Sequence, residues 1–457
     1  MMRPLNLIIG LALYLGLEVG AGPLLGEVAS GLAILTAIAW LWLSEALHLS
    51  VTALLVPLLA TTSGIMPLDQ ALAAFANPVI FLFLGGFALA TGLREQGLDR
   101  WLATWVVHRA GPGLGRAARA LFWLTALLSM WISNTATAAM MLPLALGLLA
   151  TLPAAPKTEP ETKTARNTRI YVLLGIAFAA NIGGIGTLVG SPPNAIAAAN
   201  TGLGFAAWLM IGVPLVILML PLMELALRLS LRPQLTGQVE PVGEPLRWGR
   251  AQWLMLLVFA STVLAWVFGS LIADWLQIST GYDAAVALVA LIALHAFGLA
   301  PWRAIAERTD WGVLLLFGGG LTLSLVLEAS GAGAWLASLL AGPFGSMPVV
   351  LSLMLVVLFA MALTEVASNT ASAALLIPLF IGLAPQIDSI AMAMLIALGT
   401  SCAFLLPVAT PPNAIIFGSG QVPQRAMLRG GLWVSAAILP LLFALAALLA
   451  LGLSDAL

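Results

Sequence analysis

Residues 129–136 read Ser-Met-Trp-Ile-Ser-Asn-Thr-Ala, and residues 364–371 read Thr-Glu-Val-Ala-Ser-Asn-Thr-Ala. Each octapeptide lies inside a long apolar stretch, at 117–150 and 347–384 respectively. Serine, asparagine and threonine side chains compete with the helical backbone for hydrogen bonds, so they favour caps and turns. Each stretch therefore predicts two helices joined by a polar turn.

The overall composition places these turns in a membrane protein. Of 457 residues, 61% are hydrophobic and only 8% are charged, whereas soluble domains carry about 25% charged residues. The net charge of −1 gives no sign of a nucleic-acid partner. Cys402 is the single cysteine and the three histidines are scattered, so no metal cluster is expected, and we find no nucleophile–base pair. We therefore predict an all-α polytopic protein of the lipid bilayer that is not an enzyme.

The apolar stretches outside the two hairpins predict eleven transmembrane helices. They lie at residues 5–22, 28–47, 50–64, 78–94, 170–200, 205–229, 251–273, 284–300, 311–328, 388–417 and 430–452. Each hairpin arm has about 15 residues and a length of about 22 Å, which is less than the hydrocarbon thickness of about 30 Å. With the N-terminus in the cytoplasm, all 18 Lys and Arg residues fall on the inner side. Counting either hairpin as a crossing would break this asymmetry, so both are interpreted as re-entrant. The C-terminus is then expected outside the cytoplasmic membrane.

Two further sequences repeat in the same order as the polar turns. Gly190-Ser-Pro-Pro-Asn-Ala-Ile resembles Ala409-Thr-Pro-Pro-Asn-Ala-Ile, and Phe83-Leu-Gly-Gly resembles Leu316-Phe-Gly-Gly. The charge pattern gives the two halves opposite orientations. Inverted repeats are typical of secondary transporters, in which the substrate site lies near the membrane midplane.

The two Pro-Pro pairs break helices within apolar segments, because proline lacks an N–H donor. The carbonyl groups of Gly190 and Ala409 are therefore freed at membrane depth. Such carbonyl oxygens, together with hydroxyl and amide oxygens, suit Na⁺. Asn194 and Asn413 are expected to cap the restarting helices.

The charge of the predicted site limits the substrate. No Lys or Arg lies at the predicted membrane depth, so a bound dianion must be held by neutral dipoles, helix N-termini and co-bound cations. Two similar polar tips suit a ligand with an acidic group at each end. The residues thus predict Na⁺-coupled symport of a C4-dicarboxylate such as succinate. A sulfate or tricarboxylate symporter, a dicarboxylate exchanger and an anion channel are the alternatives, although a channel needs a continuous pore.

The doubled Ser-Asn-Thr sequence with its two Pro-Pro-Asn breaks resembles the divalent anion/sodium symporter family. The resemblance extends from about Asn77 to Ile416. It implies a homodimer that works as an elevator, in which a transport domain slides against a dimerising scaffold. We expect scaffold segments, each with an interfacial helix, and transport segments, each with a hairpin and a broken helix. The scaffold segments are 1–116 and 230–346, and the transport segments are 117–229 and 347–457.

The same resemblance implies the ligands of two sodium ions and of the substrate. The first Na⁺ would be bound by Ser129, Ser133, Asn134 and the carbonyl of Gly190. The second Na⁺ would be bound by Thr364, the carbonyl of Ala367, Asn369 and the carbonyl of Ala409. The substrate carboxylates would be bound by Asn134 and Thr135 at one end, and by Ser368, Asn369 and Thr370 at the other. Glu365, beside Thr364, is interpreted as a structural hydrogen-bonding residue.

The charge asymmetry makes a direct prediction about topology. Single cysteines at Thr158 and Ser454, in a Cys402→Ala background, should react with an impermeant thiol reagent from opposite sides of the membrane. Labelling in sealed right-side-out and inside-out vesicles measures this. Labelling of both positions from one side would contradict the eleven-crossing topology.

Overall fold

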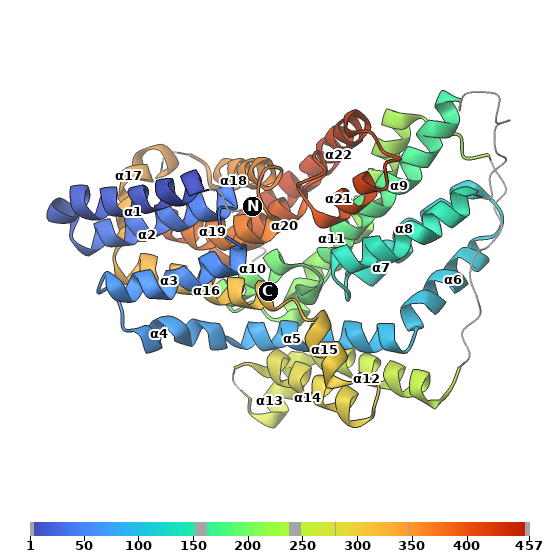
Figure 1. The fold of residues 1–457 in the computed structure, drawn as a ribbon, viewed down its shortest axis with the longest axis horizontal. Coiled ribbons are helices and arrows are strands. Elements are labelled where there is room, and N and C mark those ends of the chain that lie inside the picture. Colours follow the sequence, from blue (N-terminus) through green and yellow to red (C-terminus); the bar gives the residue numbers. More distant parts are fainter. Residues whose placement is uncertain (1–3, 151–161, 237–247, 279, 346, 453–457) are drawn as a thin grey trace.

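The computed structural model describes residues 4–150, 162–236, 248–278, 280–345 and 347–452. Every regular element in these ranges is helical (Figure 1). The first half contains α1 (Pro4–Leu25), α2 (Glu27–Ser44), α3 (Leu49–Thr62), α4 (Leu68–Ala73), η1 (Ala74–Ala76), α5 (Pro78–Glu95), α6 (Leu98–Ala110), α7 (Leu114–Ser129), α8 (Asn134–Ala150), α9 (Lys163–Gly184), η2 (Leu188–Gly190), α10 (Pro192–Thr201) and α11 (Phe205–Leu231). The second half contains α12 (Arg250–Val267), α13 (Gly269–Leu276), α14 (Tyr282–Ala296), α15 (Trp302–Arg308), α16 (Trp311–Ala329), α17 (Ala332–Gly345), α18 (Val349–Thr364), α19 (Asn369–Leu383), α20 (Ser389–Ser401), α21 (Pro411–Gly418) and α22 (Gln424–Ala450).

Seven helical segments of the described chain are long and apolar enough to cross a membrane. They are α1, α2, the segment Leu68–Glu95 that ends with α5, α11, α12, α16 and α22. The other four predicted spans coincide with α3, α14 and the broken pairs α9–α10 and α20–α21. The number of crossings and the sides of the termini stay predictions. Thr158 and Ser454 lie outside the described residues.

Both predicted hairpins are present. In the first, α7 ends at Ser129 and α8 begins at Asn134; in the second, α18 ends at Thr364 and α19 begins at Asn369. The asparagine and threonine of each Ser-Asn-Thr sequence therefore form the first turn of the returning arm. Because the first N–H groups of a helix have no intrahelical partner, polar side chains and free N–H donors are concentrated at the same tip.

Both predicted breaks are also present, and each restarting helix, α10 or α21, begins with the Pro-Pro pair. Proline is tolerated there because the first helical N–H groups have no partner in any case. The prediction that Asn194 and Asn413 cap these helices was wrong. The Thr410 hydroxyl caps α21 by accepting the N–H of Asn413, and Ser191 precedes α10 without a side-chain cap. Asn194 and Asn413 are the third residues of their helices, beyond the capping position, so their side-chain amides can bind other backbone groups.

The two halves are interlocked. The restarting helix of each half packs on the returning hairpin arm of the other, so that α10 contacts α19 and α21 contacts α8. Helices α5 and α16 also pack on helices of the opposite half: α5 contacts α14, and α16 contacts α3. The first hairpin lies at one end of the long axis and the second toward the other (Figure 1). This arrangement brings the two polar tips toward the middle of the molecule.

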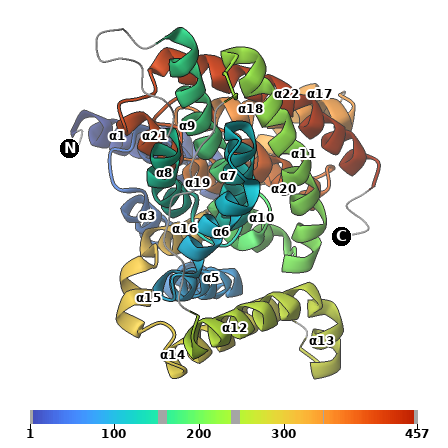
Figure 2. The ribbon, with the colours of Figure 1, turned by 90° about the vertical axis from the view of Figure 1, so that its right-hand side faces the viewer.

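Helices α12, α13 and α14 lie along one edge, on the far side of α5 from the hairpins (Figure 2). The sequence predicted one span over 251–273, but α12 ends at Val267 and α13 begins at Gly269. Glycine has little helix propensity, which accounts for the break after Phe268. The two predicted interfacial helices correspond to α6 and α17, and each joins a long helix to a hairpin.

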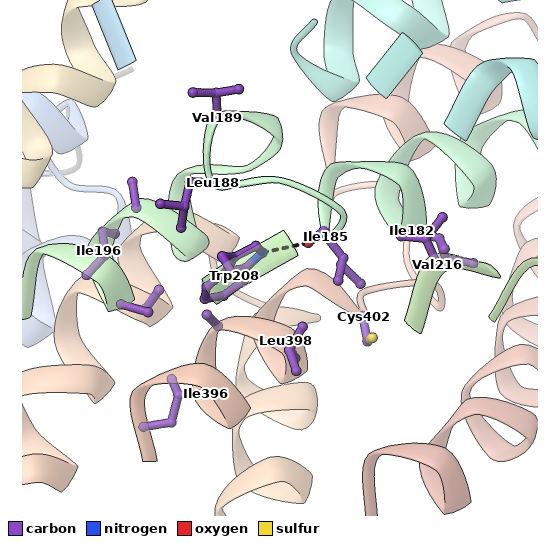
Figure 3. Close-up of a cluster of buried hydrophobic side chains, with 14 of the residues drawn as sticks. Ile182, Ile185, Leu188, Val189, Ile196, Trp208, Val216, Ile396, Leu398 and Cys402 are labelled. Atoms are coloured by element: carbon purple, nitrogen blue, oxygen red, sulfur yellow. Dashed lines mark hydrogen bonds between the residues drawn. The ribbon is translucent and has the colours of Figure 1, made fainter. Parts of the chain in front are cut away.

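The first break is fixed by packing from α11. The Trp208 indole N–H donates to the carbonyl oxygen of Ile185 at 2.9 Å, among buried apolar side chains that include Cys402 (Figure 3). Gly212 allows this close approach, since a Cβ atom there would lie 2.8 Å from the carbonyl oxygens of Ile185 and Gly186. The unwound backbone is therefore rigidly held despite its missing helical hydrogen bonds.

Candidate functional site

A single cavity of about 570 Å³ contains both hairpin tips and both helix breaks. Its wall includes most of the residues that the sequence predicted for ions and substrate: Ser133, Asn134, Thr135, Gly190, Ser368, Asn369, Thr370 and Ala409. Ser129 and Thr364 are fully buried behind the two asparagines. Ala367 lies in the second hairpin turn, 5% exposed, and is outside the described lining of the cavity. The structure thus gathers residues that are more than 200 positions apart in the chain.

Oxygen atoms converge on the first tip. The Asn134 side-chain amide lies 2.7 Å from Ser129 Oγ and 3.2 Å from the carbonyl oxygens of Ala180 and Gly190. Ser129 Oγ in turn donates to the Ala180 carbonyl at 2.7 Å. The amide has two possible orientations: either Nδ2 donates to the three oxygens, or Oδ1 joins them around a cation. Ser133, the remaining predicted ligand, accepts the N–H of Ala136 at 3.3 Å.

The second tip has a similar cluster. The Thr364 hydroxyl lies 2.6 Å from Asn369 Oδ1 and 2.8 Å from the Thr400 carbonyl oxygen. One hydroxyl hydrogen can serve only one of these acceptors at a time. With the Oδ1 atom of each asparagine turned toward its hydroxyl, both tips have more oxygens than donors. At the first tip, turning the Asn134 amide over supplies the missing donors. The carbonyl groups of Ala180 and Thr400 were missed by the sequence analysis, because any residue can supply a carbonyl.

Two glycines make the first cluster possible. A Cβ atom on Gly184 would lie 2.5 Å from Asn134 Oδ1, and one on Gly190 would lie 2.6 Å from the Gly184 carbonyl oxygen. Both distances are too short for any side chain. Glycine at these two positions lets the broken helix approach the hairpin tip closely enough for the carbonyl of Gly190 to reach Asn134.

Two asparagines satisfy the carbonyl groups that the breaks leave free. Each Nδ2 donates to two carbonyl oxygens in or directly beside the unwound segment that precedes its helix. For Asn194 these belong to Gly184 and Thr187, both at 2.8 Å, and for Asn413 to Ala403 at 3.2 Å and Leu406 at 3.1 Å. A buried carbonyl without a partner is costly, so these residues stabilise the unwound segments.

Glu365 holds the second break from within the hairpin. Its carboxylate accepts the backbone N–H groups of Phe404 at 2.8 Å, Leu405 at 3.0 Å and Leu406 at 3.1 Å, and its side chain is only 6% exposed. Hydrogen bonds to a charged acceptor are stronger than neutral ones. The structural hydrogen-bonding role predicted from the sequence agrees with this geometry.

The wall opposite the tips carries ionisable groups that the sequence analysis did not assign to the site. They are Glu45, His48 and Asp310, and the described lining contains no Lys or Arg. His48 Nδ1 accepts the N–H of Ser50 at the start of α3, and Asp310 Oδ1 accepts the N–H of Val313 at the start of α16. The repeat identifies Asp310 only as a helix cap, because it aligns with Asn77, which caps α5.

Comparison with known proteins identifies the family. The sequence model described as citrate transporter matches residues 39–399, most of the chain. The chain belongs to the citrate transporter family. It is therefore a multi-pass membrane transport protein rather than an enzyme.

Relatives support this assignment over nearly the full length. An uncharacterized transporter of Haemophilus influenzae is 49% identical over 411 residues, covering 88% of this chain and 87% of that protein. The sodium-dependent dicarboxylate transporter SdcS of Staphylococcus saprophyticus is 31% identical over 430 residues, covering 88% and 82%. The resemblance inferred from the doubled motifs is thereby confirmed.

Solved transporter structures share the fold. The YdaH transporter of Alcanivorax borkumensis superposes with a TM-score of 0.58 at 17% identity, covering 85% of this chain and 87% of that chain. MtrF of Neisseria gonorrhoeae gives a TM-score of 0.56 at 12% identity, covering 83% of each chain.

The hydrogen bonds of Glu365 make a stability prediction. Glu365→Gln removes the charge and presents N–H donors to backbone N–H donors, which should cost about 1.5–3 kcal/mol. We expect the melting temperature of the detergent-purified protein, followed by intrinsic fluorescence, to fall by several degrees. Glu328→Gln is the matched control, because Glu328 is exposed on α16. A melting temperature equal to that of the wild type would show that the carboxylate does not stabilise the break.

Proposed function

We propose that the protein is a secondary active transporter that couples Na⁺ to the symport of a C4-dicarboxylate, such as succinate, across the cytoplasmic membrane. The observation that carries this proposal is the shared cavity, in which two oxygen-rich tips face one space of about 570 Å³. Relatives named sodium-dependent dicarboxylate transporters support it as well.

Charge balance explains why ions and substrate would bind together. The described cavity wall supplies no cationic Lys or Arg, and Glu45 and Asp310 are acidic. A dianion brought into such a space without compensation would be strongly destabilised. Two sodium ions at the tips would neutralise it. Ser129, Ser133, Asn134 and Gly190 are the proposed ligands of one ion, and Thr364, Ala367, Asn369 and Ala409 of the other.

The Asn134 amide offers a second source of coupling. Its two ends are opposite in character, since Oδ1 accepts and Nδ2 donates hydrogen bonds. When Oδ1 turns toward a bound Na⁺, Nδ2 faces the cavity and can donate to a carboxylate. Without the ion, Nδ2 donates to Ala180 and Gly190, and Oδ1 faces the cavity, where it would repel the carboxylate. Ion binding would thus create the donor that the substrate requires.

The connections between segments support an elevator mechanism. Helix α6 joins α5 to the first hairpin, and α17 joins α16 to the second hairpin. We propose that 117–229 and 347–457 move as a transport domain, while 1–116 and 230–346 form the scaffold of a homodimer. The interfacial helices would serve as the arms between them.

A tricarboxylate is the second candidate substrate, because the matching family model is described as citrate transporter. Sulfate transport and dicarboxylate exchange use the same architecture and can be distinguished by the same assay.

Uptake into proteoliposomes tests the function. Labelled succinate should accumulate only with an inward Na⁺ gradient, and unlabelled citrate and sulfate should be tested as competitors. The half-saturating succinate concentration should fall as Na⁺ rises, and by linkage Na⁺ should bind more tightly with succinate present. Uptake unchanged over a hundredfold range of Na⁺ would favour an exchanger or a channel.

Substitution of the two tip asparagines tests the site. Asn134→Ala and Asn369→Ala each remove a donor and an acceptor, so each should cost about 1.5–3 kcal/mol, or roughly ten- to a hundredfold in succinate and Na⁺ affinity. The matched controls Thr137→Val and Ser372→Ala lie three residues beyond each asparagine, almost one helical turn further along the arm. Their buried hydroxyls have no hydrogen-bond partner among the described residues, so their loss should matter little. Unchanged succinate and Na⁺ affinities in both asparagine variants would show that the tips are structural turns and not binding sites.

A further inference from the structure

A separate cavity of about 650 Å³ lies between α6 and the first hairpin arm α7. Both helices lie at one end of the long axis, on the side that faces the viewer in Figure 2. Three arginines line this cavity: Arg109 in the last turn of α6, and Arg116 and Arg119 in the first two turns of α7. Its described lining contains no carboxylate, so the cavity wall is positively charged.

Two of these three charges are uncompensated. Arg119 Nε donates to Glu224 Oε2 at 3.0 Å. Arg109 and Arg116 take part in no ion pair among the described residues. The Arg109 guanidinium lies over the Trp105 ring, 5.8 Å from its centroid. Such a contact uses the face of the cation, so its N–H donors remain available for an anion.

The connection between the helices positions Arg116. It consists of Gly111, Pro112 and Gly113. A Cβ atom would lie 3.5 Å from Arg116 Nη2 at Gly111 and 3.3 Å from Arg116 Nε at Gly113. Glycine at both positions leaves space for the arginine side chain beside the backbone. The Arg116 guanidinium therefore lies at the junction of α6 and α7, next to the turn that carries Arg109.

An apolar stripe continues from the arginines along α7. Arg116, Trp123 and Leu127 recur at helical spacing and share one face of the helix. Trp123 is 38% exposed and Leu127 is 47% exposed. From Arg116 to Leu127 the helix rises about 16 Å, which is close to half the hydrocarbon thickness of about 30 Å. Since α7 ends at the polar tip inside the protein, its charged start lies toward a membrane surface, and the stripe lies at the depth of the acyl chains.

The two features together select the ligand. A free phosphate ion would pair with the guanidinium groups but leave Trp123 and Leu127 uncovered. An uncharged lipid would cover the apolar stripe but not the charges. A phospholipid with net negative charge does both, because guanidinium groups match phosphate geometry. Basic pockets between transmembrane helices bind such head groups on the cytoplasmic side, where the charge asymmetry places these arginines.

We propose that an anionic phospholipid binds between α6 and α7. Arg109, Arg116 and the remaining N–H groups of Arg119 hold its phosphate, and an acyl chain lies along Trp123 and Leu127. The lipid bridges the two helices across their glycine-rich connection, at the point where the chain passes from α5 and α6 into the hairpin. The site is independent of the transported substrate.

Native mass spectrometry of the full-length protein in detergent, titrated with phosphatidylglycerol, tests this site. Phosphatidylcholine, whose choline cation cancels the phosphate charge, should bind at least about fivefold more weakly. Arg109→Gln/Arg116→Gln should lower the affinity for phosphatidylglycerol by about 25-fold, or about fivefold for each lost charge. Arg425→Gln/Arg429→Gln is the matched control, because both arginines are exposed on α22 and lie outside the cavity. It should leave the affinity unchanged.

Two further measurements distinguish a phospholipid from a phosphate ion. Trp123→Ala should weaken phosphatidylglycerol and phosphatidylcholine equally, since it removes a contact with the acyl chain. Soluble glycerol phosphate should not displace phosphatidylglycerol. Added salt should weaken phosphatidylglycerol binding to the wild type, because the arginines are exposed to solvent, and this measurement needs no variant.

Four results would overturn the site. They are full affinity for phosphatidylglycerol in Arg109→Gln/Arg116→Gln, an equal loss in the control variant, binding that does not depend on salt, and displacement by glycerol phosphate. An unchanged affinity in Trp123→Ala would contradict the placement of the acyl chain. Because lipid binding is measured without transport, none of these results bears on Na⁺-coupled dicarboxylate transport.

Discussion

The need to satisfy every backbone polar group in a hydrocarbon environment governs this structure. Two helices are interrupted ahead of Pro-Pro pairs and two hairpins turn at Ser-Asn-Thr sequences, which frees N–H and carbonyl groups in the interior of the protein. The protein answers with specific partners. Asn194 and Asn413 bind the freed carbonyl groups, Trp208 binds another, and Glu365 binds three N–H groups. Without these partners, the buried N–H and carbonyl groups of the unwound segments would be left unpaired, which is costly.

The candidate site consists of oxygen atoms at the hairpin tips that these hydrogen bonds do not use. At the first tip, when Asn134 Oδ1 points inward, the Ser129 hydroxyl is the one donor among that oxygen and the carbonyl groups of Ala180 and Gly190. At the second tip, the single hydroxyl of Thr364 faces two acceptors. Such oxygen atoms can coordinate a cation, and the charge of a bound cation would stabilise an anion beside it. Helix breaks therefore supply ligand groups without requiring a charged side chain, which would be costly in a membrane.

The turns and breaks could be predicted because they depend on neighbouring residues. The contacts between distant segments could not be predicted from any sequence pattern. Ser-Asn-Thr and Pro-Pro act on the backbone next to them, so α8, α10, α19 and α21 begin at these sequences as expected. The preceding helices α9 and α20 end earlier than the prolines indicate, at Gly184 and Ser401. Capping propensity is local too, and it failed for Asn194 and Asn413 because their amides bind carbonyl groups of the preceding unwound segment instead. Ala180 contributes only a carbonyl group, which any residue has. His48 and Asp310 enter the cavity wall because α3 and α16 pack side by side, and no sequence pattern near either residue indicates that contact.

The departures from the repeat are as informative as the repeat. Two equivalent hairpin tips provide two equivalent ends, which suits a substrate with a carboxylate at each end. Asymmetry must then come from residues that the halves do not share. Met130 stands where the second half has Glu365, and Thr400 where the first half has Asn181. The first difference anchors one break by charge-assisted hydrogen bonds and the other by the Thr187 hydroxyl on the Met130 carbonyl. The second links the two halves, because Asn181 Nδ2 donates to Thr410 and Asn413 at the second break. An inverted repeat with such exceptions can offer two similar tips to one cavity while its two helix breaks are held by different contacts.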